Sequence, residues 1–280
     1  MTKKIYYLPN FGQLGNQLAI LAHLIAFANK YDYQIIYPYS EQLKKCLDDQ
    51  KIKNTRLTFS KTLGKKWFSY CVIKFIKYLT FNRNLQFLGA LVINKRYVID
   101  EQEAGKSFPY SIFITDWMFR FYAGVEDQQD EIKNVLSFHG QHSSRPHSFI
   151  QNIHHELAPA ALVGIHVRRG DYATWHGGKF YFDLSFYYAQ MVQIAAQISN
   201  CVFIICSNEK IAFDNTHDLH LVYAKGSDIE DLCVLSSCDY IIGPPSTFSG
   251  WAAFLGRRPI FFMQNNKDTV SMDKFFTYQV

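Results

Sequence analysis

Two arginines and an aspartate stand close together in the sequence HVRRGDY, which begins at His166 near the end of an apolar run. Such charges at the end of a buried strand cost free energy unless they meet an opposite charge or a ligand. In an extended chain His166 and Arg168 share a face, whereas Arg169 points away. Because a guanidinium suits bidentate binding of phosphate, we expect Arg168 to bind a ligand. We expect Arg169 to form a structural ion pair, with Asp171 or Asp231.

Small hydroxyl residues follow a second apolar run, in the sequence GPPSTFSGW that contains Ser246 and Thr247. Side-chain hydroxyls and the backbone N–H groups at a helix start together form a site for an anion. Either residue could instead serve as a simple helix N-cap, and the two roles can coexist. We expect this loop to contact the same ligand as Arg168.

A glycine-containing loop, GQLGNQ at Gly12–Gln17, follows the first apolar run of the chain. Glycine lets the backbone approach a ligand closely, and the helix that follows offers N–H groups. A structural tight turn would explain the same glycines. We predict that Gly15 contributes the N-terminal half's share of the ligand site.

Together, the three segments indicate a cleft for a diphosphate. The chain has no GxxxxGK[ST] loop, so ATP-driven phosphoryl transfer is not expected. No Asp-x-Asp pair follows a strand to hold a divalent metal, and an arginine with a helix dipole can neutralise a leaving diphosphate. The pattern therefore predicts a glycosyltransferase that takes a nucleotide sugar and needs neither a metal nor another cofactor.

Alternating strands and helices must position these segments. In the N-terminal half, a strand at Ile5–Pro9, a helix at Leu18–Lys30 and a strand at Gln34–Tyr37 open an α/β unit. In the C-terminal half, continuous apolar runs predict an open parallel α/β sheet covered on both faces. Its predicted strands are Ala161–Val167, Cys201–Cys206, Leu219–Tyr223, Tyr240–Gly243 and Pro259–Met263, and its predicted helices are Ser185–Ile198, Asp228–Ser236 and Ser249–Leu255.

Two segments shape the predicted domain organisation. His139–Ser148 is polar without an apolar period, which predicts a linker, and its histidines lack the carboxylate or cysteine that would complete a metal site. Residues 41–96 are basic and predict a helical insertion. We expect two Rossmann-like α/β domains, 1–150 on the acceptor side and 151–280 binding the nucleotide sugar. The ligand is expected at the carboxyl ends of strands, in a cleft that the domains face.

The composition is that of a globular protein, with 48% hydrophobic and 19% charged residues among 280. It excludes disordered, collagenous and disulfide-scaffold proteins.

The net charge of +5 is unevenly distributed along the chain. Residues 1–100 hold 16 basic and 5 acidic side chains, a net +11, and residues 101–280 hold 13 basic and 19 acidic side chains, a net −6. This asymmetry suggests an anionic partner for the first part, such as a membrane or nucleic acid. A solvated basic face would also explain it.

A helix predicted at Lys66–Leu79 carries part of this charge. Lys66, Ser69, Lys74 and Lys77 share one arc, and Trp67, Phe68, Val72, Phe75, Ile76 and Leu79 occupy the rest. The helix could pack on the core with solvated lysines, or lie on an anionic lipid surface.

The beginning of the chain shows no signal-peptide pattern, and the longest apolar run is too short to span a bilayer. The six cysteines predict free, mainly buried thiols rather than a disulfide framework. We therefore expect a cytoplasmic protein, which could also bind peripherally at the inner membrane surface.

The motifs quoted above resemble those of a known family. HVRRGDY resembles the HxRRGDY signature of family 11 glycosyltransferases, the α-1,2-fucosyltransferases, and related motifs occur in α-1,6- and protein O-fucosyltransferases. GQLGNQ is similar to that family's GxLGNQ loop, STFSGWAA to its SSFSWWAA segment, and DIEDLCVLSSCD to the Asp-Leu-x-Leu-Met-Ser-x-Cys stretch between them. Residues 40–155 show little likeness.

The resemblance implies a GT-B-like fold, a GDP-β-L-fucose donor and inversion at the sugar carbon. It implies that Arg168 binds the β-phosphate. The other donor-site residues that it implies are Asn16, His166, Ser246, Thr247 and Phe248.

Two positions depart from the family pattern. Asn208 stands where the family has the first acidic residue of FSDD, so its carbonyl oxygen, or the Glu209 carboxylate, would have to read guanine. Gly250 replaces a tryptophan and is expected to open the loop on the acceptor side. Asp171 is the favoured general base, ahead of His176 and Asp183.

The sequence thus predicts an inverting fucosyltransferase that builds a surface polysaccharide or lipopolysaccharide, acting on a glycan acceptor that could be lipid-linked. One alternative is a transfer by the same fold from another nucleotide sugar. A remote alternative is a non-catalytic nucleic-acid-binding protein, using the basic region and its aromatics for stacking.

Overall fold

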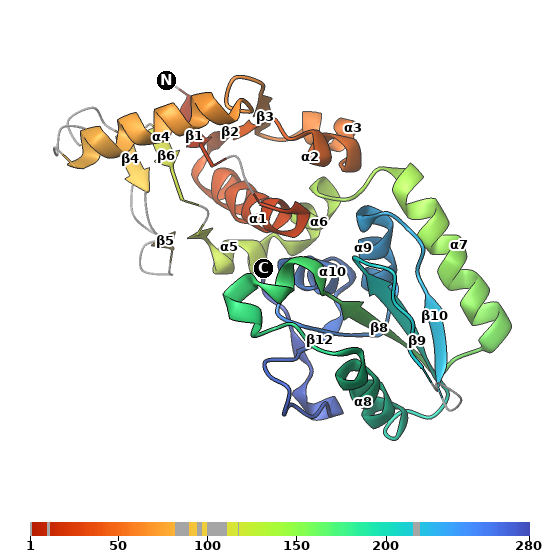
Figure 1. The fold of residues 1–280 in the computed structure, drawn as a ribbon. Helices are drawn as coiled ribbons and strands as arrows, with labels where there is room; N and C mark the ends of the chain where they lie inside the picture. The colour runs from red at the N-terminus through yellow and green to blue at the C-terminus, as the bar shows by residue number, and fades with distance from the viewer. Residues whose placement is uncertain are drawn as a thin grey trace. The chain divides into compact units, whose positions relative to one another are not determined.

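The computed structural model divides the chain into two compact units, which are Met1–His139 with Val280, and Gly140–Gln279. The structure describes residues 2–9, 12–81, 90–93, 97–99, 111–116, 118–214 and 219–280. Helix α7 (Gly140–Leu157) begins at the division and lies wholly in the second unit (Figure 1). The boundary expected after residue 150 therefore falls inside a helix.

The first unit is built on a five-stranded parallel sheet with the order β3-β2-β1-β6-β4. Its strands are β1 (Lys3–Tyr7), β2 (Tyr33–Pro38), β3 (Leu57–Ser60), β4 (Ala90–Ile93) and β6 (Ser111–Ile114), and a separate parallel pair joins β5 (Tyr97–Val98) to β7 (Phe119–Arg120). The helices are α1 (Leu14–Tyr31), α2 (Glu41–Cys46), α3 (Asp49–Lys53), α4 (Lys66–Phe81), α5 (Tyr122–Asp127) and α6 (Gln129–Val135). Because β3 and β4 belong to the main sheet, the basic region at 41–96 is not an insertion.

Helix α1 begins four residues earlier than expected, at Leu14 rather than Leu18. Gly15 and Asn16 therefore lie in its first turn and not in a loop. The turn before the helix depends on Gly12, whose φ of 107° favours glycine. The carbonyl oxygen of Gly12 accepts a hydrogen bond from Gln17 Nε2 at 2.8 Å, which ties the turn to the helix.

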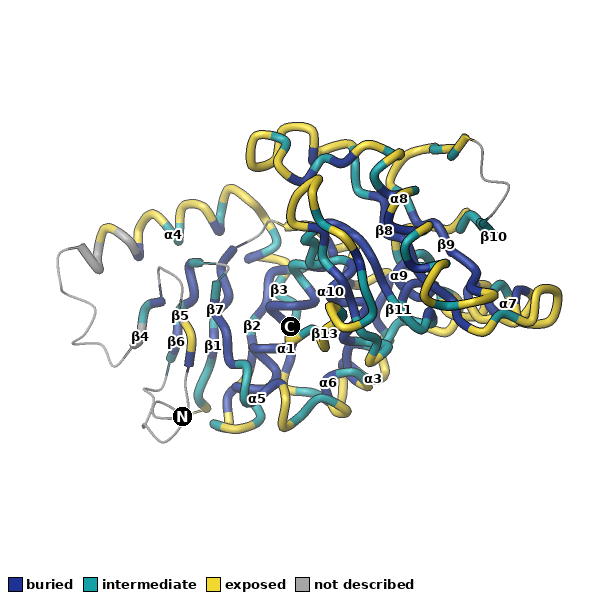
Figure 2. Tube along the Cα trace, turned by 90° about the horizontal axis from the view of Figure 1, so that it is seen from below, coloured by how far each residue is buried: buried dark blue, intermediate teal, exposed yellow. Residues whose placement is uncertain are grey.

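Helix α4 covers one face of this sheet, on the opposite side from α1 (Figure 1). Phe68, Val72 and Ile76 pack with sheet residues, and the Ser69 hydroxyl is buried and donates a hydrogen bond to the Leu63 carbonyl. The predicted basic arc is therefore wrong for Ser69. The side chains of Lys77 and Leu79 lie outside the described residues. Figure 2 shows exposed residues recurring along the outer side of α4.

The second unit contains a six-stranded sheet with the order β10-β9-β8-β11-β12-β13. Its strands are β8 (Ala161–Val167), β9 (Cys201–Ser207), β10 (His220–Tyr223), β11 (Tyr240–Gly243), β12 (Pro259–Phe262) and β13 (Phe276–Thr277), and the helices after α7 are α8 (Leu184–Ala195), α9 (Asp228–Ser237) and α10 (Thr247–Gly256). All neighbouring strands are parallel except β13, which pairs antiparallel to β12. The predicted strands and helices of this half are confirmed to within a few residues at their ends.

The core of the second unit forms on both faces of its sheet. All seven residues of β8 are buried, as expected for a central parallel strand. Helix α8 packs on one face, and α9 and α10 pack on the other (Figure 1). Gly164 in β8 permits the close approach of α9, because a Cβ there would lie 2.8 Å from Leu235 Cδ2.

The predicted linker at His139–Ser148 is wrong, because residues from Gly140 onward form α7. Pro146 lies inside this helix and is buried on the same side as Ile150 and Ile153. These residues follow the i, i+4, i+7 spacing of a helix face. The proline thus acts as an apolar packing residue here, where its usual role as a helix breaker suggested a loop.

The strand order reverses between β8 and β11, which are neighbours in the sheet. In open α/β sheets, ligands bind beyond the carboxyl ends of the strands at such a reversal. The two segments that follow these strands begin at Arg168 and Pro244. The fold of the second unit thus brings the arginine motif and the Ser-Thr loop to one edge.

Candidate functional site

Arg168 and Asp171 form an ion pair just beyond the end of β8. Arg168 Nε lies 2.9 Å from Asp171 Oδ1, and Arg168 Nη2 donates a hydrogen bond to Asp171 Oδ2 at 3.0 Å. The arginine side chain is 14% exposed and the aspartate 48%. The Arg168 backbone N–H donates to the Tyr187 hydroxyl at 3.3 Å, which fixes the end of the strand. The guanidinium is therefore held by a carboxylate at the edge where a ligand is expected.

Arg169 has a different ion-pair partner from the two that the sequence suggested. Its Nε lies 2.8 Å from Glu209 Oε1, and its Nη2 donates to the Tyr181 hydroxyl. The Arg169 backbone N–H donates to Asn208 Oδ1 at 3.1 Å. The expectation that Asp171 or Asp231 pairs with Arg169 is thus wrong. Asn208 and Glu209 both hold the arginine loop in place.

The Ser-Thr loop lies beside the arginine motif. Ser246 is the N-cap of α10, and its hydroxyl oxygen accepts a hydrogen bond from the Phe248 backbone N–H at 3.2 Å. Tyr172 donates its hydroxyl proton to the Pro245 carbonyl at 2.7 Å, which joins the two loops. Thr247 is the first helical residue. The start of α10, with its favourable field for anions, therefore belongs to the same site as Arg168.

His166 is a buried residue near the end of β8, next to this site. Its ring lies 5.2 Å from that of Phe248, centroid to centroid, and its Nδ1 has no hydrogen-bond partner among the described residues. Burial, together with the Arg168 charge, lowers the pKa of His166 to about 3. At neutral pH the imidazole is uncharged, so the positive charge of the site rests on Arg168 and the α10 dipole.

A small cavity in the first unit adjoins the glycine turn. It has a volume of about 290 Å³ and is lined by Pro9, Gly12, Gln17, Tyr37, Pro38, Ser40 and Lys66. It lies where β1 and β2 end, next to the helix turn that holds Gly15 and Asn16. The expected part of Gly15 and Asn16 in a site shared with Arg168 stays a prediction, because they belong to the first unit and Arg168 to the second.

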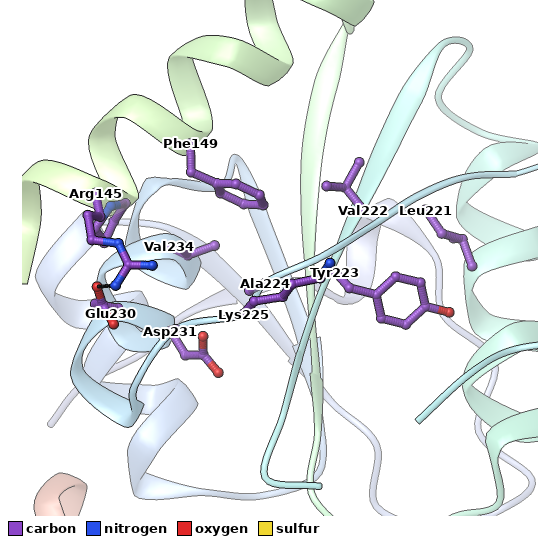
Figure 3. Close-up of a pocket in the computed structure, with 12 residues that line it drawn as sticks. Arg145, Phe149, Leu221, Val222, Tyr223, Ala224, Lys225, Glu230, Asp231 and Val234 are labelled. Atoms are coloured by element: carbon purple, nitrogen blue, oxygen red, sulfur yellow. Dashed lines mark ion pairs between the residues drawn. The ribbon is translucent and has the colours of Figure 1, made fainter. Parts of the chain in front are cut away.

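A larger cavity of about 480 Å³ lies within the second unit, where β10 ends (Figure 3). Its lining comes from α7, from β10 with the turn after it, and from α9. Phe149 projects from α7 toward β10, and Arg145 lies 3.2 Å from Glu230 in an ion pair (Figure 3). The lining residues are Arg145, Pro146, Phe149, Leu221, Val222, Tyr223, Ala224, Lys225, Gly226, Glu230, Asp231 and Val234.

Asp231 lines this cavity, whereas sequence reasoning gave it only a possible ion pair with Arg169. Its Oδ1 is buried and has no hydrogen-bond partner among the described residues. Burial, reinforced by the Asp228 and Glu230 carboxylates and opposed by the Gly226 backbone, raises the pKa of Asp231 to about 7. A signal was present in the sequence, because Asp231 stands four residues before the apolar Leu235 and therefore shares a side of the predicted helix with it.

The small size of Gly250 predicted an open loop on the acceptor side, and this prediction is wrong. The residue is buried inside α10, and the ring of Tyr278 lies against it. A Cβ on Gly250 would be 2.5 Å from Tyr278 Cζ. The space that the family's tryptophan would take is therefore filled by a residue from the end of the chain.

Among the residues that the structure describes, no three His, Cys, Asp or Glu side chains gather in a group that could hold a metal ion. Over the same residues, no helix is both long and apolar enough to cross a bilayer. The six cysteines are free, and five of them are buried, the exception being Cys71 on α4.

Comparison with known proteins gives curated relatives that include galactoside alpha-(1,2)-fucosyltransferases. Galactoside alpha-(1,2)-fucosyltransferase 2 of Mus musculus is 28% identical over 185 residues, which cover 54% of this chain and 52% of that protein. Galactoside alpha-(1,2)-fucosyltransferase 1 of Mus musculus is 23% identical over 188 residues, with coverages of 55% and 49%. The chain spans about half the length of the curated relatives it matches.

Two solved structures share the fold over nearly the whole chain. The fucosyltransferase NodZ from Bradyrhizobium has a TM-score of 0.59 at 15% identity, covering 94% of this chain and 96% of that one. POFUT1 in complex with GDP-fucose has a TM-score of 0.57 at 12% identity, with coverages of 92% and 95%. These likenesses confirm the GT-B-like fold that the sequence predicted.

The family model described as Glycosyl transferase family 11 matches residues 93–277. This range contains the arginine motif, the Ser-Thr loop and Asp231, and it leaves out Gly15 and Asn16. Because the match spans more than half of the chain, the protein belongs to glycosyl transferase family 11.

Proposed function

We propose that this protein is a fucosyltransferase that takes GDP-β-L-fucose and transfers L-fucose, with inversion, to a glycan hydroxyl in an α-1,2 linkage. The observation that carries the proposal is the Arg168–Asp171 ion pair, which lies where the strand order reverses and beside the start of α10. Membership of family 11 supports the reaction class. The relatives named as α-1,2-fucosyltransferases and the POFUT1 complex with GDP-fucose support the sugar and the donor.

The proposed reaction is one displacement at the fucose C1. The acceptor oxygen forms a bond to C1 while the bond from C1 to the β-phosphate oxygen breaks, and GDP leaves with the electron pair. Arg168 and the N–H groups at the start of α10 stabilise the charge that develops on the diphosphate. Asp171 is the proposed acceptor of the hydroxyl proton, and its contact with Arg168 also supports a role in holding the guanidinium.

The cavity at the end of β10 is the proposed seat of the guanine base. Strands β8 and β10 are separated only by β9, so their ends lie roughly 10 Å apart. A nucleoside diphosphate bound at Arg168 can reach across that distance. Phe149 and Val234 offer apolar surface for the faces of a base, and the ionised Asp231 carboxylate can accept from the two N–H groups on the guanine edge.

This assignment changes the roles of Asn208 and Glu209. Both were predicted to contact the donor base in place of the family's carboxylates. Since Asn208 accepts from the Arg169 backbone and Glu209 pairs with its side chain, we now propose that they shape the donor site by fixing the arginine loop. His166, Ser246, Thr247 and Phe248 remain proposed donor contacts.

The first unit is the proposed acceptor side. Its cavity beside the glycine turn is lined by amide, hydroxyl and ammonium groups, which suit the hydroxyls of a sugar. Gly15 and Asn16 of this unit remain proposed donor contacts. The acceptor is proposed to be a glycan of a surface polysaccharide or lipopolysaccharide, carried on a lipid.

A donor screen tests the proposal and its rival, a transfer from another nucleotide sugar. The purified chain is titrated with GDP-fucose, GDP-mannose and UDP-galactose by calorimetry, with EDTA present, and turnover is followed with a glycan acceptor array. We expect binding of both GDP-sugars, transfer of fucose alone, and no loss in EDTA. Tight binding of a UDP-sugar, or of no nucleotide sugar, would contradict the proposal.

Arg168 variants provide the matched test of the site. We expect Arg168→Ala to lower transfer by at least about a thousandfold and Arg168→Lys by about a hundredfold, because lysine keeps the charge without the bidentate geometry. Arg56→Ala is the control, since Arg56 pairs with Asp32 in the first unit and lines neither the base cavity nor the cavity beside the glycine turn. Near-normal turnover in Arg168→Ala would show that Arg168 does not bind the donor diphosphate.

A further inference from the structure

The outer side of α4 presents large aromatic side chains to solvent. Trp67 is 67% exposed, Tyr70 57%, Phe75 61% and Tyr78 67%. Together with the exposed Cys71 and Lys74 they follow the i, i+3, i+4, i+7, i+8, i+11 pattern of a single helix face. We call this face, Trp67, Tyr70, Cys71, Lys74, Phe75 and Tyr78, the aromatic stripe. Burying such side chains is favourable, so their exposure points to a partner surface.

The opposite side of α4 explains why the stripe is not part of the core. Phe68, Val72, Ile73 and Ile76 already pack on the sheet with Leu8 and Leu63. The Ser69 hydroxyl also points inward and bonds to the Leu63 carbonyl. One face of α4 therefore packs on the sheet of its own unit, and the opposite face exposes four aromatic rings. A helix that only faced water would not need these rings.

The charges around the stripe identify the kind of partner. Between Asp49 and Asp100 the sequence has eleven Lys and Arg residues and no Asp or Glu. Lys65 and Lys66 are exposed at the start of α4, and the Lys74 ammonium lies 4.6 Å from the centre of the Tyr70 ring. A partner that binds the aromatic rings and the lysines together must have an apolar layer that buries the rings, and negatively charged groups above it that bind the lysines.

We propose that the aromatic stripe of α4 docks this protein on the surface of an anionic lipid bilayer. Trp and Tyr side chains favour the headgroup region, and lysines beside them bind anionic lipid headgroups. A helix of 16 residues lying flat would extend along roughly 24 Å of the surface. Lys66, which opens α4, also lines the cavity beside the glycine turn, so docking would bring lipid close to that cavity.

Vesicle flotation tests this proposal with the whole chain. The protein is mixed with vesicles of phosphatidylcholine alone, or with 30% phosphatidylglycerol added, in about 0.15 M salt. We expect the protein to float with the anionic vesicles and to stay behind with the neutral ones. Failure to float with either composition would overturn the proposal, as would equal binding to both.

Surface variants identify the element responsible. We expect Trp67→Ser, Phe75→Ser and Tyr78→Ser combined to weaken anionic-vesicle binding at least about tenfold, because three rings are lost from the interface. Lys74→Glu should weaken it roughly tenfold by reversing one charge. Val192→Ser and Lys267→Glu, at exposed positions of the second unit, are the controls and should bind normally. Unchanged binding by the α4 variants would refute the role of the stripe.

Cys71 allows a direct test of docking depth, because the other five cysteines are buried. An environment-sensitive fluorophore attached to Cys71 should shift its emission to the blue when anionic vesicles are added. The same fluorophore on a Cys71→Ser, Val192→Cys variant should not shift. An unshifted probe at Cys71 would contradict insertion of the stripe.

Three other readouts, which are GDP binding, oligonucleotide binding and self-association, separate this inference from the proposed function and from its rivals. GDP binding should be unchanged in every α4 variant, because the donor residues lie elsewhere. If the aromatic variants lose binding to an oligonucleotide, or lose self-association in sedimentation, while vesicle binding is unaffected, a nucleic acid or a second copy is the true partner and the lipid proposal fails.

Discussion

The carboxylate of Asp171 faces the guanidinium of Arg168 with both of its oxygens. That arrangement gives Asp171 two proposed tasks, holding the arginine and taking the acceptor proton. An amide at this position keeps the shape and one acceptor oxygen but loses the charge and the basicity. The two tasks therefore predict different kinetic consequences.

We expect Asp171→Asn to raise the KM for GDP-fucose about tenfold, because the guanidinium loses its fixed partner. Loss of a general base should lower kcat by a further hundredfold or more. Steady-state kinetics at saturating acceptor measure the two constants separately. If the KM rises but kcat stays within about tenfold of the wild-type value, Asp171 only positions Arg168 and the base is another residue.

Asp231 should make donor binding dependent on pH. Its pKa of about 7 in the free protein means that the carboxylate is half protonated at neutral pH. Accepting two N–H groups requires the ionised form, so GDP affinity should rise as pH increases through 7 and fall about tenfold per unit below it. Calorimetry between pH 5.5 and 8.5 measures this slope.

The Asp231→Asn variant is the matched control for that slope. Its affinity for GDP should be lower at pH 8 and nearly independent of pH, because the amide does not titrate in this range. A wild-type affinity that stays flat from pH 5.5 to 8.5 would show that Asp231 does not contact the base.

At the scale of single residues, the sequence predicted the central groups and missed their partners. Arg168 and Ser246 were found because each follows a recognisable strand. The pairing of Arg169 with Glu209 joins the ends of β8 and β9, and sequence spacing cannot say which of several carboxylates meets an arginine across two strands. Asp231 was considered only as an ion-pair partner of Arg169, and not as a group that could contact a ligand.

At the scale of elements, the contact between α9 and α10 depends on a glycine. Gly256 ends α10, and a Cβ there would overlap the backbone carbonyl oxygen of Ser236. Backbone cannot move aside as the end of a side chain can. We expect Gly256→Ala to destabilise the protein by roughly 1–3 kcal/mol, because the helices must move apart.

Thermal and urea unfolding of Gly256→Ala measure this cost, with Gly140→Ala as the control. A Cβ on Gly140 would meet nothing within 4 Å. Equal stability of the two variants would show that the close approach of α9 and α10 is not needed.

Strong apolar runs made the elements of the second unit predictable. Strands β8 and β11 have the predicted bounds, because each is a continuous buried run. The segments whose structure was not predicted correctly have a weak hydrophobic periodicity. Helix α7 buries only Pro146, Ile150 and Ile153, and α2 and α3 are short helices held by the caps Ser40 and Asp48. Such elements are fixed by tertiary packing more than by their own periodicity.

At the scale of the whole molecule, each unit contains, among its described residues, one histidine that is buried uncharged. Burial, with the Arg120 charge, lowers the pKa of His23 in the first unit to about 3, and His166 in the second unit behaves alike. Unfolding returns both to the usual value near 6.5, so the unfolded chain binds protons that the folded chain does not. Their contribution to stability is complete above pH 6.5 and is lost as pH falls from 6.5 toward 3.

We therefore expect the free energy of unfolding to fall by up to about 1.4 kcal/mol per pH unit for each histidine below pH 6.5. Urea unfolding at pH 7.5, 6.5 and 5.5 measures the slope. His23→Asn should be less stable at pH 7.5 but should show a shallower decline. A decline that is identical in the variant and the wild type would mean that other groups set the acid limit.

The uneven charge of the molecule also has a practical consequence for handling it. The proposed donor site depends on one sheltered arginine in the acidic half, whereas the proposed lipid contact depends on exposed lysines in the basic half. Ions in solution screen exposed charges far more than sheltered ones. Washing a membrane fraction with concentrated salt should therefore release the protein in a form that still binds GDP, which would make the wash a purification step.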